Sequence, residues 1–449
     1  MDEAMKKLTL IYNARFIDES VDLHKGALLI KNGKIERFLQ QRELQKFLRY
    51  GGSGEGIQLY DAQGLTVMPA FIDMHAHFRD PGLTQKENLA SGSRAAAAGG
   101  FGTLVLMPNT KPVISSQEAA LANDKKGKEI GLAHLIQSVS ITENFDGQTI
   151  AHLNDLDKKI VPLITEDGHE VQDSAVMFEA MKIAAKKKII VSCHCEDPFL
   201  AAAARPLRKA ALEKIEQGNK KEAVKLLRQA DELLRLAEDT ATDRNIALAA
   251  MAGCHLHLCH VSTKHCIEAV ARAKRAGQDI SAEVTPHHIG LTGGTAPGIL
   301  NIVNPPLRSE EDRHALIEAL IDGTADCIAT DHAPHTAGDK RSGSPGFSGL
   351  ESAFAVCYTN LVLDSGMDLQ KLSSCMSATP ARLLGLKDRG LLKTGCHADL
   401  AVVDTEKRWT VKGENFKSKG HYTPWEGKKL TGKVEAVFFN GQMTQAECQ

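Results

Sequence analysis

Two histidines separated by one residue follow a short apolar run in the first part of the chain. His75 and His77 come after residues 67–72, which predict a short buried strand, and Pro81-Gly82 ends the extended segment. Side chains alternate along a strand, so residues two apart point to the same side. Neutral imidazole is a preferred ligand for zinc. The pair therefore indicates a chelating site, although a single His-x-His is also compatible with ordinary pocket or surface histidines.

Further metal-binding side chain types stand at the ends of later apolar runs. These are Asp167, His194, His260 and Asp331. With His75 and His77 they make a set of imidazoles and carboxylates that is typical of a metal or catalytic site. Cys193 and Cys195 flank His194, but alternation along a strand directs both thiols away from the imidazole, so we do not expect them to be ligands.

Strand-like runs alternate with helix-like segments through most of the chain. The predicted strands are residues 67–72, 103–107, 133–138, 160–164, 189–193, 256–259, 280–284 and 326–329, and helical spacing marks residues 85–98, 172–187, 264–276 and 309–322. This alternation predicts a parallel (β/α)₈ barrel of the TIM type. In such a barrel the side chains just past the C-terminal strand ends meet on one face, so we expect the polar groups above to converge there.

Both chain ends carry a different pattern. Short alternating segments with an Asn32-Gly33 turn precede the barrel, and a second Asn-Gly turn, Asn440-Gly441, follows strand-like residues 434–439. We expect residues 1–66 and 390–449 to form one small, sandwich-like β domain, and residues 67–389 to form the barrel. Residues 200–250 are longer than a βα loop needs and have helical spacing, which predicts a helical insertion.

Composition limits the possible functions. The chain has 449 residues, 43% of them hydrophobic and 24% charged, which is typical of a globular protein. A net charge of −2 gives no global field that would favour nucleic acid or an anionic membrane. No segment approaches the roughly 20 apolar residues that would span a bilayer, and residues 1–7 have no signal-like apolar run. Ten scattered cysteines favour a reduced compartment. We therefore expect a cytoplasmic protein that acts on a small molecule.

The motifs at the predicted strand ends resemble, in order and in spacing, those of the dihydroorotase family in the amidohydrolase superfamily. They are HAHFRDPG (75–82), MPNT (107–110), EDG (166–168), HCE (194–196), CHVST (259–263), NPPLR (304–308), DHAPH (331–335) and PGFSGLE (345–351). The resemblance extends from about residue 69 to residue 404. Ala70 departs from the glycine usual in the superfamily, Glu166 departs from a frequent aspartate, and the segment between His194 and His260 is longer.

The resemblance implies one or two zinc ions per subunit. It implies that His75, His77 and Asp331 hold one ion, that His194 and His260 hold a second, and that Asp167 bridges or neighbours them. A carboxylated lysine is the alternative bridge. Lys158 and Lys159 are its candidates, although they stand at or before the start of a predicted strand.

Substrate recognition requires an anion clamp if the substrate carries a carboxylate. Arg79 offers a planar two-pronged contact. By resemblance Asn109 and His335 assist it, and Asn304 contacts polar atoms of the ring. The glycine- and serine-rich segment 338–349, which contains Gly346 and Phe347, follows His335 directly, so we expect it to form a pocket wall, with a mobile connector as the alternative. The alternatives are a surface ion pair for Arg79, turn roles for the two asparagines and a loop cap for His335.

The implied reaction is the reversible, zinc-dependent hydrolysis of (S)-dihydroorotate to N-carbamoyl-L-aspartate in de novo pyrimidine biosynthesis. Asp331 is the expected catalytic residue, because a carboxylate beside the metal can accept a proton from water and return it to the leaving nitrogen. A role as ligand only, or as a helix N-cap, remains open for Asp331.

Two other functions remain open. An allantoinase or hydantoinase shares the barrel and the metals, but its ring substrate lacks the carboxylate that Arg79 would bind. A catalytically silent partner of aspartate transcarbamoylase would be expected to lose metal ligands, whereas this chain keeps those matched. We expect a homodimer, with association with aspartate transcarbamoylase possible for an active enzyme too.

Overall fold

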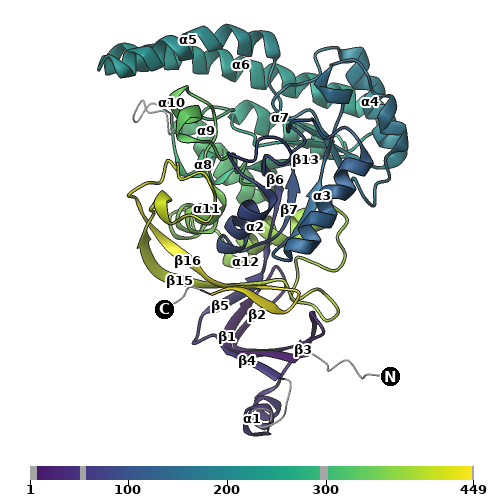
Figure 1. The fold of residues 1–449 in the computed structure, drawn as a ribbon, viewed down its shortest axis with the longest axis vertical. Helices are drawn as coiled ribbons and strands as arrows, with labels where there is room; N and C mark the ends of the chain where they lie inside the picture. The colour runs from purple at the N-terminus through teal and green to yellow at the C-terminus, as the bar shows by residue number, and fades with distance from the viewer. Residues whose placement is uncertain (1–7, 51–56, 294–301, 447–449) are drawn as a thin grey trace.

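The structure, a computed structural model, describes residues 8–50, 57–293 and 302–446. A barrel of parallel strands wrapped by helices lies next to a β sheet to which both ends of the chain contribute (Figure 1). Residues 1–7, expected to lack a signal-like run, are outside the described residues. The proposed division into domains stays a prediction.

The barrel is closed by parallel pairing. In chain order its strands are β6 (Phe71–Ala76), β7 (Phe101–Leu106), β8 (His134–Gln137), β9 (Val139–Ser140), β10 (Leu163–Thr165), β11 (Ile190–Cys193), β12 (Leu256–Leu258), β13 (Ile280–Val284) and β14 (Cys327–Ile328). One run pairs β6, β7 and β8, and a second pairs β9 through β14 in sequence. Only Ser138 separates β8 from β9, and a parallel bridge between Ala76 and His332 joins the last segment to the first. The predicted (β/α)₈ fold class is confirmed.

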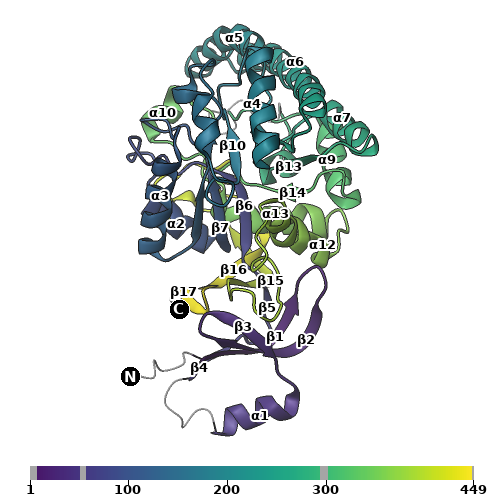
Figure 2. The same cartoon turned by 90° about the vertical axis from the view of Figure 1, so that its right-hand side faces the viewer.

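Helices cover the outside of the barrel (Figure 2). They include α2 (Leu89–Ala98), α3 (Gln117–Ile130), α4 (Ser174–Lys187), α7 (Lys264–Arg275) and α9 (Glu310–Asp322). Each begins after a polar residue whose side chain accepts a hydrogen bond from a backbone N–H of the first turn; these caps are Asn88, Ser116, Asp173, Thr263 and Ser309. Shorter helices follow: α8 (Pro286–Gly290), α10 (Ala337–Arg341), α11 (Leu350–Cys357), α12 (Leu369–Ser373) and α13 (Thr379–Leu383).

The prediction of a single strand at residues 67–72 was wrong in one respect, because these residues are divided between two sheets. Its first part, β5 (Thr66–Pro69), pairs with strands from the two chain ends. The chain then changes sheet at Ala70. The N–H of Ala70 donates to the backbone carbonyl of Asp399, whereas the N–H of Phe71 donates to the backbone carbonyl of Gly100. Both parts are fully buried, so an apolar run alone could not show that it serves two sheets.

The second sheet joins the two ends of the chain. Its order is β17 (Gln442–Ala446), β16 (Lys429–Phe439), β15 (Leu400–Thr410), β5, β1 (Leu8–Ile17), β2 (Asp22–Lys31) and β3 (Lys34–Phe38), with β4 (Ile57–Asp61) paired to β1. Helix α1 (Gln41–Tyr50) lies beyond β3. The two predicted Asn-Gly turns are present, and all four residues have positive φ. The two turns lie against each other: a Cβ added to Gly33 would be only 2.8 Å from the carbonyl oxygen of Asn440.

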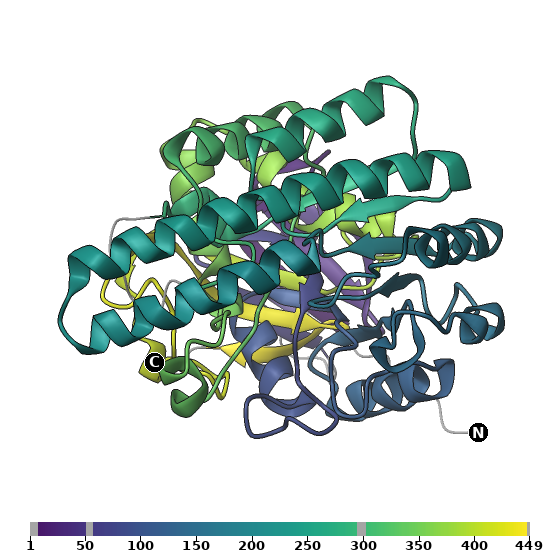
Figure 3. The same ribbon diagram turned by 90° about the horizontal axis from the view of Figure 1, so that it is seen from above.

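The predicted helical insertion is a long hairpin. Helices α5 (Pro198–Glu216) and α6 (Lys220–Ala252) pack side by side and lie across the end of the barrel (Figure 3). Ala201, Ala204, Ala230 and Leu234 form the apolar contact between them. Within the described parts of the chain, no helix has both the length and the apolarity that crossing a membrane requires.

Candidate active site

Three candidate ligands meet where the barrel closes. His75 and His77 lie at the end of β6, and Asp331 follows β14. Asp331 Oδ1 is 3.0 Å from His77 Nε2 and 3.7 Å from His75 Nε2. The bridge between Ala76 and His332 holds the two segments together, so closure of the barrel brings these side chains into contact.

The other three candidates come from three consecutive strands elsewhere in the barrel. Asp167 follows β10, His194 follows β11 and His260 follows β12. Asp167 Oδ1 lies 3.3 Å from His75 Nε2 and 3.7 Å from His194 Nδ1, while Asp167 Oδ2 lies 3.6 Å from His77 Nε2. His194 Nδ1 and His260 Nε2 are 2.9 Å apart. All six predicted ligand side chains therefore form one continuous cluster.

This cluster has the donor atoms that a divalent cation requires. The possible ligand atoms of His75, Asp167 and His260 lie within 4.8 Å of one another, as do those of His75, His77 and Asp331. His75 Nε2 and His260 Nδ1 are buried, and neither has a hydrogen-bond partner among the residues that the structure describes. Buried nitrogens without partners are costly in a folded protein unless they bind a ligand. The residues thus fit one or two metal ions of the kind that prefers imidazole and carboxylate.

The electrostatics keep both carboxylates ionised. Burial opposes this, but the imidazoles of His75, His77 and His194 hold the pKa of Asp167 well below its usual range. The pKa of Asp331 is also far below its ordinary value, since the hydrogen bond to His77 and the nearby imidazoles outweigh burial. Burial, followed by the charges of His194 and His75, lowers the pKa of His260 to about 3.

Three of the predicted site residues have a left-handed backbone. The φ angles are 58° at Arg79, 33° at His260 and 47° at Asp331. For residues other than glycine this conformation costs about 1–3 kcal/mol each, and it is concentrated at functional sites. Here each such residue directs its side chain toward the common cavity.

A cavity of about 250 Å³ opens above the cluster. The predicted residues that line it are His77, Arg79, Asn109, Asp167, His194, His260, Asn304, Asp331, His335 and Gly346. His75 is completely buried behind it. Phe347 departs from the prediction: its ring packs with Val303 and Leu307, so it supports the wall without lining it.

Arg79 is the cation of this cavity. Its Nε is buried and has no hydrogen-bond partner within the described residues. Burial lowers the pKa of Arg79, and the nearby carboxylates of Asp331 and Asp167 partly offset this effect. A guanidinium whose Nε–H lacks a partner in a small cavity is suited to bind a carboxylate.

Asn109 connects two of the candidate ligands. Its Nδ2 donates to Asp167 Oδ2 at 2.9 Å, and its Oδ1 lies 3.0 Å from His77 Nδ1. The second contact fixes His77 with its Nδ1 protonated and leaves Nε2 for a metal. The structure therefore adds an orienting contact to the substrate role expected from the sequence.

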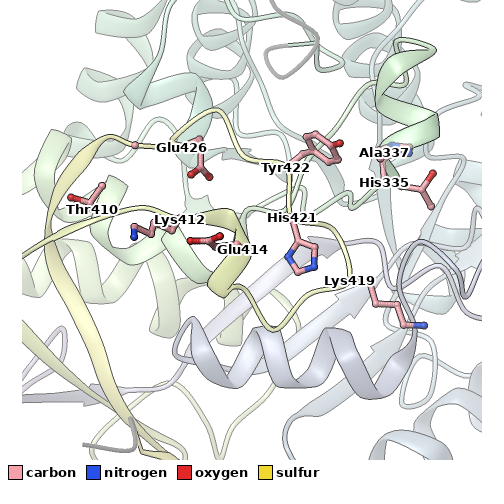
Figure 4. A pocket seen from close by; sticks show the side chains of 11 residues that line it. His335, Ala337, Thr410, Lys412, Glu414, Lys419, His421, Tyr422 and Glu426 are labelled. Carbon is pink, nitrogen blue, oxygen red and sulfur yellow. The ribbon is translucent and has the colours of Figure 1, made fainter.

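His335 lies between two cavities. Its Nε2 donates to the carbonyl of Pro345 at 2.8 Å, and its Nδ1 is 3.4 Å from Lys86 Nζ. It also lines a neighbouring cavity of about 530 Å³ between α10 and the segment that contains Lys412 and His421 (Figure 4). Gly346 lies against it with φ of 111°, and a Cβ there would lie 2.6 Å from that of Ala333.

The alternative ligands do not join the cluster. Lys158 and Lys159 are exposed and do not line the cavity, so a carboxylated lysine has no support from them. Cys193 and Cys195 are buried, and burial raises the pKa of both thiols. No disulfide joins the cysteines of the described residues.

Two buried carboxylates that orient the ligands were not found from the sequence. Glu283 of β13 lies 3.1 Å from His75 Nδ1, and its oxygens also contact His257 Nε2 and the N–H of His260. Asp73 accepts from the N–H groups of His75 and Thr330 and so ties β6 to the segment before Asp331. The sequence signal that could have revealed them is an acidic residue in or next to an apolar run, because a buried carboxylate requires a hydrogen-bond or charged partner.

A closed parallel barrel with imidazoles and carboxylates at its C-terminal strand ends belongs to the class of metal-dependent barrel hydrolases. The chain belongs to the amidohydrolase family, whose model matches residues 66–444. The family resemblance seen in the motifs is thereby confirmed.

Curated relatives match over nearly the whole chain. A dihydroorotase from Clostridium botulinum (strain Eklund 17B / Type B) is 42% identical over 435 residues, covering 97% of this chain and 98% of the relative. A dihydroorotase from Listeria innocua serovar 6a is 37% identical, covering 98% and 99%. The fold is shared with the L-hydantoinase (dihydropyrimidinase) from Arthrobacter aurescens, with a TM-score of 0.85, 24% identity and coverage of 99% and 97%.

Proposed function

We propose that this chain is a dihydroorotase, which interconverts (S)-dihydroorotate and N-carbamoyl-L-aspartate. The observation that carries the proposal is the buried Nε of Arg79, which has no partner in the described parts of the chain, in a small cavity that the candidate metal ligands also line. Dihydroorotate presents both groups that this arrangement addresses, a carboxylate and a cyclic amide. The names of the curated relatives support the same activity.

The proposed site residues fall into metal ligands and substrate-binding residues. His75, His77, Asp167, His194, His260 and Asp331 are the proposed ligands of one or two zinc ions. When bound, zinc polarises a carbonyl and makes water acidic enough to act as a nucleophile near neutral pH. Arg79 holds the substrate carboxylate, Asn109 and His335 support it, and Asn304 and the backbone around Gly346 contact the ring.

Asp331 is the proposed proton carrier. Its carboxylate lies at the cavity surface, and its low pKa keeps it ionised and able to accept a proton from water. The same group then returns the proton to the ring nitrogen as the amide bond breaks. Its contact with His77 at 3.0 Å orients the carboxylate for both steps.

Further proposals concern the metal, the assembly, the location and the pathway. We propose zinc as the metal, a homodimer as the assembly, the cytoplasm as the location and pyrimidine biosynthesis as the pathway. Association with aspartate transcarbamoylase is a further possible assembly for the active enzyme, testable by co-purification.

The decisive experiment measures metal content and activity on the same preparation. The purified protein is assayed with dihydroorotate, allantoin, hydantoin and dihydrouracil, before and after chelation and zinc reconstitution. Zinc-dependent turnover of dihydroorotate well above the other three is the expected result. Preference for hydantoin or allantoin would replace the proposal with the alternative enzyme class, and zinc-loaded protein without turnover of any of them would favour the silent partner.

A further inference from the structure

Arg208 connects the helical hairpin to the cavity wall. It lies on α5, and its side chain is only 15% exposed. Its Nη1 donates to Asn304 Oδ1 at 2.6 Å, and its Nη2 donates to the backbone carbonyl of Val303 at 3.1 Å. Asn304 lines the cavity. A residue from the insertion thus contacts a residue of the proposed substrate pocket directly.

The second helix of the hairpin holds this contact in place. Asp231 of α6 has its Oδ1 3.7 Å from Arg208 Nη2. The backbone carbonyl of Asp231 accepts a hydrogen bond from Arg308 Nη1 at 3.0 Å. Arg208 therefore reaches residues 303–304 while Arg308, four residues beyond Asn304, is tied back to α6. The hairpin fixes both ends of this short segment.

The contact decides which polar group Asn304 offers to a ligand. A side-chain amide has one acceptor oxygen and one NH₂ donor group. Because the guanidinium has only donors, Asn304 must direct Oδ1 toward Arg208, and an amide flip would set donor against donor. The NH₂ group remains for the cavity. A fixed NH₂ donor selects a carbonyl oxygen of the substrate ring over a ring N–H.

We propose that Arg208 is a positioning residue for substrate recognition, which holds the Asn304 amide with its NH₂ toward a ring carbonyl. The inference rests on the proposed function for the identity of the ring. It also gives the helical insertion a role, because the hairpin supplies the guanidinium that orients part of the cavity wall. None of the six candidate metal ligands hydrogen-bonds to Arg208 among the contacts of the described residues.

A double-mutant cycle on Arg208 and Asn304 tests the proposal. We expect Arg208→Met to raise KM for dihydroorotate roughly tenfold with kcat nearly unchanged, as loss of one charged hydrogen bond predicts. Asn304→Ala should raise KM similarly. In the Asn304→Ala background, Arg208→Met should add less than about a twofold change, because the two residues act through one contact. Independent, multiplicative effects would overturn the proposal.

Two further variants separate positioning from charge and from stability. Arg208→Lys keeps the positive charge beside Asp231 but loses the fork that reaches two oxygens, so an intermediate KM is expected. Lys209→Met, an exposed neighbour on α5, should leave KM unchanged. Zinc content and thermal unfolding are recorded for every variant. A fall in kcat that follows zinc loss, or wild-type KM in Arg208→Lys and Arg208→Met alike, would contradict the positioning role.

Failure of the proposed function is distinguishable from failure of this inference. If the wild-type protein hydrolyses hydantoin or another cyclic amide instead of dihydroorotate, the proposed function fails, and the same cycle is run with that substrate. Such rings also carry carbonyl oxygens. Coupling between residues 208 and 304 would then still support the positioning role, and its absence would remove it.

Discussion

Glu283 and His75 form a buried pair beneath the candidate metal cluster, with Glu283 Oε1 3.1 Å from His75 Nδ1. Hydrogen bonds from His257 and His75 overcome burial and hold the pKa of Glu283 at about 2, so it is a carboxylate. An ionised acceptor at Nδ1 requires the proton to be there, which leaves Nε2 of His75 as a ligand atom. The pair therefore sets the tautomer of a candidate ligand.

Glu283→Gln should weaken zinc binding about 10- to 100-fold, the usual effect of losing an orienting carboxylate. Zinc affinity is measured by competition with a chromophoric chelator, and zinc content by elemental analysis. Glu238→Gln is the control, because Glu238 is also buried but contacts Ser262 and Arg308 and none of the six candidate ligands. Equal zinc affinity in Glu283→Gln and the wild type would remove the orienting role.

Asp331→Asn should lower kcat by about 10²- to 10⁴-fold, because the amide cannot accept the proton that the reaction requires. Far-UV circular dichroism should remain unchanged. Asp326→Asn is the matched control: Asp326 precedes the same strand, at its other end, where it contacts Lys274 and the N–H of Ala282. Substantial turnover by zinc-loaded Asp331→Asn would exclude the residue as the base.

Arg79→Met should raise KM for dihydroorotate roughly 10- to 100-fold, since a charged hydrogen-bonded contact to the carboxylate is lost. Activity on dihydrouracil, which lacks that carboxylate, should change little. The ratio of the two specificity constants is therefore the informative measurement. Arg94→Met, an exposed arginine on α2, serves as the control for loss of one positive charge. A preserved ratio in Arg79→Met would contradict the clamp.

Glu351 should make the folded state less stable as the pH rises. Burial raises its pKa to about 8 even though it accepts hydrogen bonds from the N–H groups of Ser418 and Lys417. The folded state thus holds a proton that the unfolded chain, with an ordinary carboxyl pKa, releases. Its stabilising contribution is complete at low pH and is lost as the pH rises toward about 8, with a slope of at most about 1.4 kcal/mol per pH unit.

Glu351→Gln should remove that slope. The measurement is urea unfolding between about pH 5 and pH 8.5, at a fixed zinc concentration, a range that covers this pKa shift. Glu414 is an exposed acid that lines a surface cavity together with Glu351, and Glu414→Gln should unfold with the pH dependence of the wild type. The explanation fails if Glu351→Gln keeps the full slope.

Local patterns were sufficient for most elements of the barrel and for the candidate ligands. His75 and His77 are two residues apart on a strand, and His194, His260 and Asp331 each stand just past another apolar run. Because parallel barrel strands all end on one face, the identity and position of these residues in the sequence predicted that they would meet. The six side chains are found in one cluster. Their roles in metal binding and catalysis remain predictions for the experiments above.

Contacts between distant segments were decided only by the tertiary structure. The sequence determined a barrel with its polar residues at the strand ends, because alternation and apolar runs are local properties of the chain. Which carboxylate orients His75, where residues 67–72 change sheet and how Arg208 reaches Asn304 depend on packing between segments far apart in sequence. These hydrogen bonds form only where folding of the barrel and the hairpin brings two polar groups within about 3 Å of each other. No local sequence pattern determines that distance.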